Sequence, residues 1–357
     1  MSFASDNWAG ASDKVAAALA EANAGDAPAY GNDPFTARAN AALSDYFERE
    51  VAAFFVATGS AANALALAHA YRTGGAVIAH PDSHIASDEA GGPLLHAPGM
   101  MLDLVDGPAG RLPAEAVAAR IARYRGGSPR EGRVTALSFA NTNELGQTYS
   151  PDEVAALAGA AKAHGVRVHL DGARFSNALA FTGAAPADLT WRAGVDMMSL
   201  GFTKTGAWCA EAVVFFDPSE GEEFAYRHQQ AGHVLSKARF VGAQVCAMVG
   251  DGHARELAAH ANAMAAALAG ALEQSGKAAL AVPCQSNEVF AFLAPDAAER
   301  LKAAGVQAYP WALRSAHPPA PPEPDWVLHR FVASFRTTPA DVERAADALT
   351  GSDAQPG

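Results

Sequence analysis

The chain has 357 residues, and 50% of them are apolar, so it can bury a large core and is expected to form one large and one smaller domain. Its formal net charge of −12 opposes binding to nucleic acid and to anionic membranes, because such binding depends on Lys and Arg. No apolar run reaches about eighteen residues and no signal-like segment starts the chain, so we expect a cytoplasmic protein.

Cysteine and lysine are both scarce. The cysteines lie far apart and no Cys or His residues have the spacing of metal ligands, so we expect neither disulfides nor a metal site; they are Cys209, Cys246 and Cys284. The lysines are Lys14, Lys162, Lys204, Lys237, Lys277 and Lys302. If the chemistry needs an amine, one of these must supply it.

The first part of the chain predicts two helices and then a repeated unit. Residues 12–25 predict a helix with Ser12 as N-cap and Gly25 past its end, and residues 30–48 predict a turn and a second helix. Apolar runs then precede helical segments four times: 51–57 before 58–70, 75–80 before 81–91, 133–139 before 150–165, and 166–170 before 171–181. This alternation predicts βαβ units and a mostly parallel sheet.

The rest of the chain predicts a change of architecture. Strands are predicted at 195–202 and 211–216, then helices at 224–249 and 254–276. Strands at 278–283, 287–293, 306–311 and 326–335, helices at 296–305 and 338–351, and a proline-rich surface loop at 317–325 predict an α+β unit. We predict an α/β fold: a large cofactor-binding domain (1–250), whose central sheet is mostly parallel with helices on both faces, and a smaller C-terminal α+β domain (251–357).

In open α/β sheets, ligands bind beyond the carboxyl ends of the strands, so the turns after strands are site candidates. The first is residues 58–63. Its small residues Gly59 and Ser60 let the backbone approach an anion, and the N–H groups and dipole of the new helix favour a phosphate. The alternative is that Ser60 is only the N-cap.

Histidines and carboxylates follow two other strands. His80, His84 and Glu89 lie in the second turn, where an imidazole either packs in the loop or stacks on an aromatic ligand and carries protons. Asp171 follows the strand 166–170, and Arg174 lies shortly after it. Asp171 either only forms the turn with the glycine that follows it, or it is a carboxylate, backed by the arginine, that holds a protonated ring nitrogen.

Lys204 is the lysine best placed for chemistry. Four others lie in amphipathic helices, near a helix end or in a polar loop and are expected to be solvated: Lys14, Lys162, Lys277 and Lys302. Lys237 belongs to a polar helical patch. Lys204 follows the strand 195–202, where a confined, partly dry site favours the neutral amine that forms imines, although a strand-end lysine can also simply reach solvent.

Together the four turns contain the parts that hold pyridoxal phosphate. They are a phosphate turn, a histidine that stacks on the ring, an acid for the pyridine nitrogen and a Schiff-base lysine. The G-x-G-x-x-G run of an NAD site and the G-K-[ST] phosphate loop are both missing from the sequence. We therefore predict pyridoxal phosphate as the cofactor.

These residues lie in motifs that resemble the low-specificity L-threonine aldolase family, whose members have the pyridoxal-phosphate-dependent transferase fold type I. The resemblance extends from SDNWAG at residues 5–10 to RFVASF at 330–335. Its most specific pieces are YGNDPFT, TGSAANALAL, SHIASDEAG, HLDGARFSNA and SLGFTKTG, in that order along the chain.

The resemblance implies roles for individual residues. The cofactor-binding residues would be Gly59, Ser60, His84, Asp171, Arg174, Thr203 and Lys204. Among them Lys204 would form the Schiff base, Asp171 would pair with the pyridine nitrogen and His84 would stack on the ring. The substrate-binding residues would be Ser5, Tyr30, Asn143, Arg174 and Arg330, with Ser5 and Arg330 on the substrate carboxylate. For Arg330 the alternatives are a strand-edge charge or the nearby Arg336, and for Ser5 the alternative is a disordered terminus.

Two further expectations come from the resemblance. Tyr30 and Arg239 match residues that reach into the site of a neighbouring subunit, which implies a homodimer or homotetramer. Many relatives carry ENTH where this chain has ANTNEL, so Asn143 replaces a histidine near the substrate hydroxyl, and Glu144 is the alternative hydroxyl-binding group.

The implied reaction is cleavage of threonine, allo-threonine and related β-hydroxy-α-amino acids to glycine and an aldehyde. Its catalytic residues would be Lys204, Asp171 and His84, with His84 as the candidate base for the β-hydroxyl proton. The alternatives are a β-eliminating lyase of the same fold, an aldolase for phenylserine or 3-hydroxyaspartate, or a catalytically silent binding module. The last is disfavoured because all three residues are present.

Overall fold

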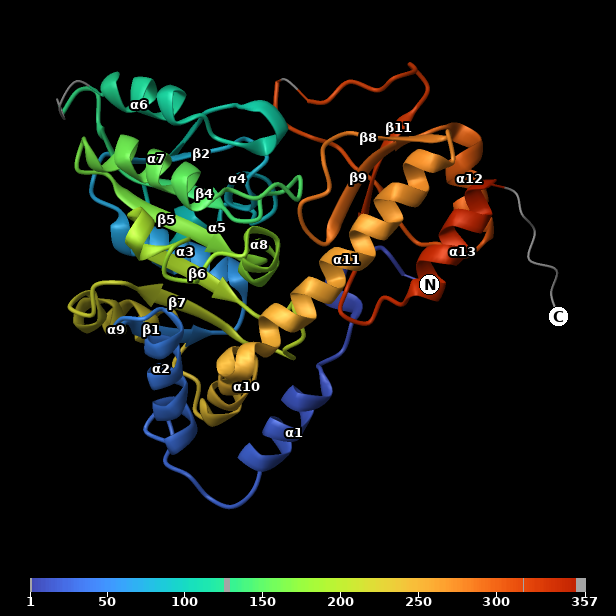
Figure 1. The fold of residues 1–357 in the computed structure, drawn as a ribbon. Helices are drawn as coiled ribbons and strands as arrows, with labels where there is room; N and C mark the ends of the chain where they lie inside the picture. Colours follow the sequence, from blue (N-terminus) through green and yellow to red (C-terminus); the bar gives the residue numbers. More distant parts are fainter. Residues whose placement is uncertain (1, 125–128, 317, 351–357) are drawn as a thin grey trace.

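The computed structural model of the chain describes residues 2–124, 129–316 and 318–350. Figure 1 shows a large unit built around one sheet and a smaller unit built around a second. The first sheet has the order β1-β7-β6-β5-β4-β2-β3. Its strands are β1 (Ala52–Val56), β2 (Gly75–Ala79), β3 (Met101–Leu104), β4 (Arg133–Ala140), β5 (Arg167–Gly172), β6 (Met197–Gly201) and β7 (Glu211–Phe215).

The large sheet is mostly parallel, as predicted. β3, β2, β4, β5 and β6 run in the same direction, whereas β7 is antiparallel to both β6 and β1. The carboxyl ends of β4, β5 and β6 therefore meet at one edge of the sheet. Edge strand β3 was not predicted, since its residues are only partly buried or exposed and lack a continuous apolar run.

Helices cover both faces of this sheet, because neighbouring strand residues point to opposite faces. Met198 and Val214 pack in the core under α7, α8 and α10, whereas Met197 and Val213 pack in the core under α3 and α9. The helices are α1 (Asp13–Ala22), α2 (Pro34–Tyr46), α3 (Gly59–Ala70), α4 (His84–Ser87), α5 (Gly92–His96), α6 (Ala114–Ala122), α7 (Pro151–Lys162), α8 (Phe175–Thr182), α9 (Glu220–Gln230), α10 (Arg239–Val249), α11 (His253–Gln274), α12 (Pro295–Ala303) and α13 (Pro339–Thr350).

Side-chain caps fix where several of these helices begin. Ser12 accepts a hydrogen bond from the N–H of Val15 and caps α1, as predicted. Ser150 and Glu153 form a reciprocal capping box at the start of α7. Such caps satisfy backbone N–H groups that have no partner within the helix.

Two predicted helices are divided in the structure. The helix predicted at 224–249 is wrong as one element: α9 ends at Gln230, Gly232 adopts a φ of 72°, and α10 starts at Arg239. The segment predicted at 81–91 holds only the short α4, and α5 starts one residue later at Gly92 after Gly91 in the left-handed region. Glycine readily takes that backbone conformation and interrupts helices.

The second sheet is antiparallel, in the order β10-β11-β9-β8. Its strands are β8 (Ala278–Leu280), β9 (Glu288–Leu293), β10 (Tyr309–Pro310) and β11 (Val327–Val332). Helices α11, α12 and α13 cover it, and in Figure 1 α11 extends from the small unit to the large one. Residues 318–325 contain no helix or strand, as predicted, whereas residues 317 and 351 of the predicted segments lie outside the described residues.

The N-terminal arm packs against the small sheet. Phe3 is fully buried in the core of the small unit, its N–H donates to the carbonyl of Gln307, and its carbonyl accepts from the N–H of Val332. The arm thereby carries the residues that follow Phe3 toward the large sheet.

The division of the chain into two domains between residues 250 and 251 stays a prediction. In the part of the chain that the structure describes, no helix is long and apolar enough to cross a bilayer.

Candidate active site

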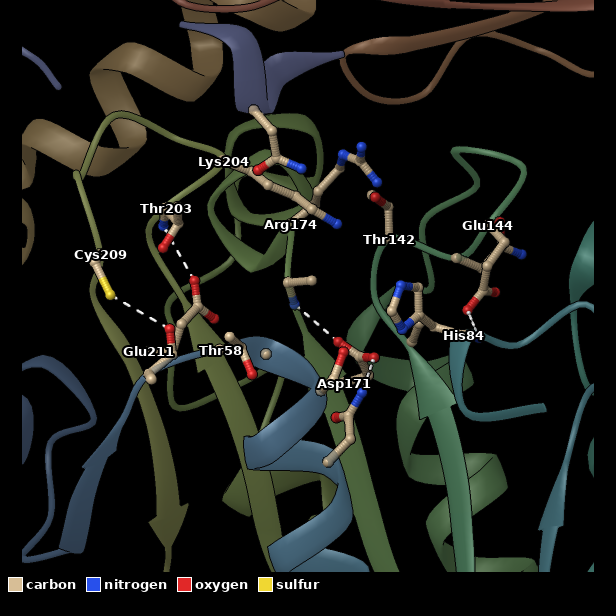
Figure 2. A pocket seen from close by; sticks show the side chains of 18 of the residues that line it. Thr58, His84, Thr142, Glu144, Asp171, Arg174, Thr203, Lys204, Cys209 and Glu211 are labelled. Atoms are coloured by element: carbon tan, nitrogen blue, oxygen red, sulfur yellow. Dashed lines mark hydrogen bonds between the residues drawn. The ribbon is translucent and has the colours of Figure 1, made fainter. Parts of the chain in front are cut away.

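A cavity of about 410 Å³ lies beyond the carboxyl ends of β4, β5 and β6. Figure 2 shows Lys204, Asp171 and His84 among the side chains that line it. The other lining residues are Asn7, Ala57, Thr58, Gly59, Ser60, Asn63, Ala140, Thr142, Asn143, Glu144, Ala173, Arg174, Thr203, Trp208, Cys209 and Glu211. Four strand-end turns that are far apart in the sequence thus meet in one place.

Lys204 is the lysine that lines this cavity. It lies in the turn just after β6 and is partly buried. Three other lysines are in surface ion pairs, Lys14 with Asp251, Lys162 with Asp196 and Lys277 with Asp296, and Lys237 and Lys302 are exposed. Among the described residues, no carboxylate oxygen lies within 4.0 Å of the Lys204 amine. Its amine is therefore available to a ligand.

Asp171 is the second-to-last residue of strand β5 and is 8% exposed. Its Oδ2 accepts a 2.8 Å hydrogen bond from Asn63 Nδ2, and its Oδ1 accepts a 3.0 Å bond from the N–H of Ala173. The expectation that Arg174 backs this carboxylate is wrong, since Arg174 is bonded elsewhere. A side-chain amide and a backbone N–H hold Asp171 instead.

His84 starts α4 and is held by a second carboxylate. Its Nδ1 lies 2.8 Å from Glu89 Oε1, and that same oxygen accepts a 2.8 Å bond from Asn63 Nδ2. The hydrogen bond to Glu89 raises the pKa of His84 against the opposing effect of burial. His80, in contrast, is buried and bonded to the backbone of Gly107, which is a loop-packing role.

Asn63 therefore links Asp171 to Glu89 and, through Glu89, to His84, a role that was not predicted from the sequence. It is a buried amide on α3, a helix whose other buried residues are Ala and Leu. A lone amide on such a helix was the available signal, because a buried polar group needs partners.

The N-terminus of α3 faces the same cavity. Thr58, not Ser60, is its N-cap, and its side chain accepts a 3.1 Å bond from the N–H of Ala61. Ser60 lines the cavity, and a Cβ added at Gly59 would lie 3.4 Å from Glu211 Oε2. The first N–H groups of a helix together with its dipole attract anions, and this turn leaves room for one.

Glu211 is a second site residue without a role in the sequence analysis. It opens β7 at 7% exposure, and its Oε1 accepts a 3.3 Å bond from the N–H of Thr203. Burial raises the pKa of Glu211 to about 7. The sequence signal for this residue was an acid at the first position of an otherwise apolar strand.

Arg174 belongs to a buried charge network that joins the N-terminal arm to the small sheet. Its Nε lies 2.8 Å from Asp6 Oδ2, and its Nη1 lies 3.1 Å from Glu288 Oε2. Burial alone would lower the pKa of Arg174, but Asp6 and Glu288 raise it instead. Arg330 is the outer member, with Nη1 3.9 Å from Glu288 Oε1 and its guanidinium carbon 3.9 Å from the Trp311 ring centroid.

Several expected substrate residues lie outside the cavity lining. Arg330 is connected through Glu288 to Arg174, which lines the cavity. Arg336 donates to the carbonyl of Ala11. Ser5 caps the short helix Asp6–Trp8 by accepting from the N–H of Asn7. Tyr30 is 63% exposed, and Arg239 donates to the carbonyl of Gly25.

Comparison of the sequence and the structure with known proteins identifies a family and several relatives. The sequence profile of the beta-eliminating lyase family matches residues 2–312. The low specificity L-threonine aldolase of Pseudomonas aeruginosa is 40% identical over 308 residues, which cover 86% of this chain and 88% of that protein. A structure of Leishmania major threonine aldolase has a TM-score of 0.89 at 26% identity and covers 98% of each chain.

A structure described as SPT with PLP has a TM-score of 0.69 at 19% identity, over 98% of this chain and 86% of its own, and its likeness concerns the fold alone. The architecture is that of the pyridoxal-phosphate-dependent transferase fold type I, as predicted. Within that class, the chain belongs to the beta-eliminating lyase family.

Proposed function

We propose that this protein is a pyridoxal-phosphate-dependent aldolase that cleaves L-threonine, L-allo-threonine and related β-hydroxy-α-amino acids to glycine and an aldehyde. The observation that carries the proposal is the meeting of Lys204, Asp171 and His84 in one cavity. The names of the Pseudomonas aeruginosa and Leishmania major relatives support the substrate class.

The residues of the cavity fit the cofactor. Lys204 offers an amine that has no ion pair within the part of the chain that the structure describes, and the N-terminus of α3 with Gly59, Ser60 and Thr203 offers a phosphate site. When bound, pyridoxal phosphate supplies an aldehyde that an amine captures and a ring that withdraws electrons from a breaking bond. Asp171 would hold the proton on the ring nitrogen, with its carboxylate oriented by Asn63.

Arg174 and Arg330 would bind the substrate carboxylate, with Ser5 at the edge of the site. Asp6 and Glu288 hold the Arg174 guanidinium in one orientation. A fixed carboxylate orients the rest of the substrate, so this clamp would decide which bond of Cα is cleaved.

The proposal is tested by product analysis with threonine, allo-threonine and phenylserine. Release of glycine and aldehyde supports it, whereas release of ammonia and the 2-oxo acid with the full carbon skeleton of the substrate indicates a β-eliminating lyase. Lys204→Ala should remove both the visible absorbance of the bound cofactor and the activity, while Lys237→Ala, an exposed lysine, should keep both.

The proposed assembly is a homodimer or homotetramer in the cytoplasm. Tyr30 and Arg239 lie outside the cavity of their own chain, as residues that serve a neighbouring site would. Cys209, Cys246 and Cys284 are free thiols, which suits a reducing compartment. Light scattering should give at least twice the 36.7 kDa chain mass, and a monomer would contradict the assembly.

A further inference from the structure

The loop after β4 places two polar side chains at the cavity, and the structure separates their roles. Asn143 Nδ2 donates a 3.0 Å bond to the carbonyl of Ala109. Its Oδ1 accepts bonds of 3.0 and 2.9 Å from the N–H groups of Leu145 and Gln147. The Asn143 amide is thus used to shape its own loop, and it is poorly suited to a substrate hydroxyl.

Glu144, the next residue, has its carboxylate in the cavity wall. Its Oε1 accepts a 2.7 Å bond from the backbone N–H of His84, which fixes the carboxylate beside the imidazole (Figure 2). Burial, together with the negative charge of Asp171, raises the pKa of Glu144 to about 7. Among the charged groups around it, Asp171 raises the pKa of Glu144 and His84 lowers it. The charge of Glu144 in turn raises the pKa of Arg174.

His84 is less suited to accept a proton than Glu144. Its Nδ1 is bound to Glu89 at 2.8 Å, and that bond favours the protonated imidazolium, which has no acceptor. A carboxylate has acceptor oxygens only, so Glu144 keeps acceptor capacity in the same part of the cavity.

We propose that Glu144 is the catalytic residue that takes the β-hydroxyl proton of the substrate. It would take the role of base for which His84 is the candidate from the sequence. The O–H bond breaks with its proton going to the Glu144 carboxylate, and the oxygen electron pair forms the C=O bond of the aldehyde. The Cα–Cβ bonding pair stays with Cα, which takes up one proton to give glycine, so the step is redox-neutral. This inference rests on the proposed aldolase function.

Two reactions of the holoenzyme separate this role from a structural one. Threonine cleavage requires loss of the β-hydroxyl proton, whereas exchange of the glycine Cα hydrogen in deuterated water does not. For Glu144→Gln, which keeps the shape and the acceptor for the His84 N–H, we expect cleavage to fall by about 10²-fold or more. Glycine exchange, followed by NMR, should stay within about threefold, and cofactor absorbance should be unchanged.

Matched variants and a pH profile complete the test. Glu153→Gln removes the same charge at a surface residue outside the cavity and should leave both reactions unchanged. Glu144→Asp, which keeps an acid of shorter reach, should recover part of the lost cleavage. Because the base acts when deprotonated, wild-type cleavage should rise with pH through about 7, and this rise should vanish in Glu144→Gln.

Cleavage by Glu144→Gln at the wild-type rate would overturn the assignment, and so would equal losses of cleavage and exchange. A wild-type enzyme that exchanges the glycine hydrogen but releases no aldehyde from any β-hydroxy amino acid would instead contradict the proposed function, and this inference with it.

Discussion

Asn63 Nδ2 donates to Asp171 Oδ2 at 2.8 Å and so ties helix α3 to the end of strand β5. The same Nδ2 donates to Glu89, which holds the His84 ring. One amide therefore sets the positions of the acid and the imidazole on which the proposed cofactor site depends, and its position is determined by the packing of α3.

Replacing Asn63 by Ala should weaken cofactor binding and the fold together. Two buried carboxylates would each lose a donor, and we expect a loss of about 1–3 kcal/mol in the free energy of unfolding. Titration of the apoprotein with pyridoxal phosphate should give a raised Kd. Asn177→Ala, which breaks a 2.9 Å amide pair with Asn262 away from the cavity, is the control and should change stability but not the Kd.

Cofactor retention should depend on the charge of Glu211. Its pKa of about 7 means that the carboxyl is neutral at lower pH and becomes negative as pH rises, beside the turn proposed to hold the phosphate. The Kd for pyridoxal phosphate should therefore rise above about pH 7. Equilibrium dialysis across this range should show a flatter profile for Glu211→Gln, and identical profiles would remove Glu211 from this role.

Glu288→Gln should impair substrate binding more than turnover. Glu288 lies between Arg174 and Arg330, and loss of its charge leaves two partly buried guanidinium groups undercompensated. We expect about 3–5 kcal/mol lower stability in urea unfolding and a raised KM for threonine with a smaller change in kcat. Glu220→Gln, which bridges His69 and Arg167 away from the cavity, should lower stability without raising KM.

His169 should make the fold sensitive to acid. It is fully buried on β5 between the hydroxyls of Ser138 and Ser199, and burial lowers its pKa to about 4 from the usual 6.5. The unfolded chain then binds more protons between these values, so stability is lost as pH falls from 6.5 toward 4. Urea unfolding at several pH values should show a smaller loss for His169→Gln; an equal loss would contradict this cause.

The sequence predicts the parts of the site that follow strands. Lys204, Asp171 and His84 lie in the segments that follow predicted strands, and a parallel sheet brings its strand ends to one edge, so their meeting could be foreseen. The α/β class and the small α+β unit follow from the same patterns of apolar runs, whereas the antiparallel pairing of the small sheet comes from the structure.

The contacts between distant segments could not be foreseen. Asp6 meets Arg174 only because Phe3 anchors the N-terminal arm in the small core, and no local pattern encodes that packing. The engagement of the Asn143 amide with Ala109 likewise depends on a loop distant in sequence. Ser60 and Thr58 are both acceptable N-caps by residue type, and the backbone decides between them.

The most direct test of the account is to identify the amine that binds the cofactor. The protein loaded with pyridoxal phosphate is reduced with borohydride, digested and analysed by mass spectrometry. We expect one modified peptide, with the cofactor on Lys204. Modification of another lysine such as Lys237, or of none, would contradict it.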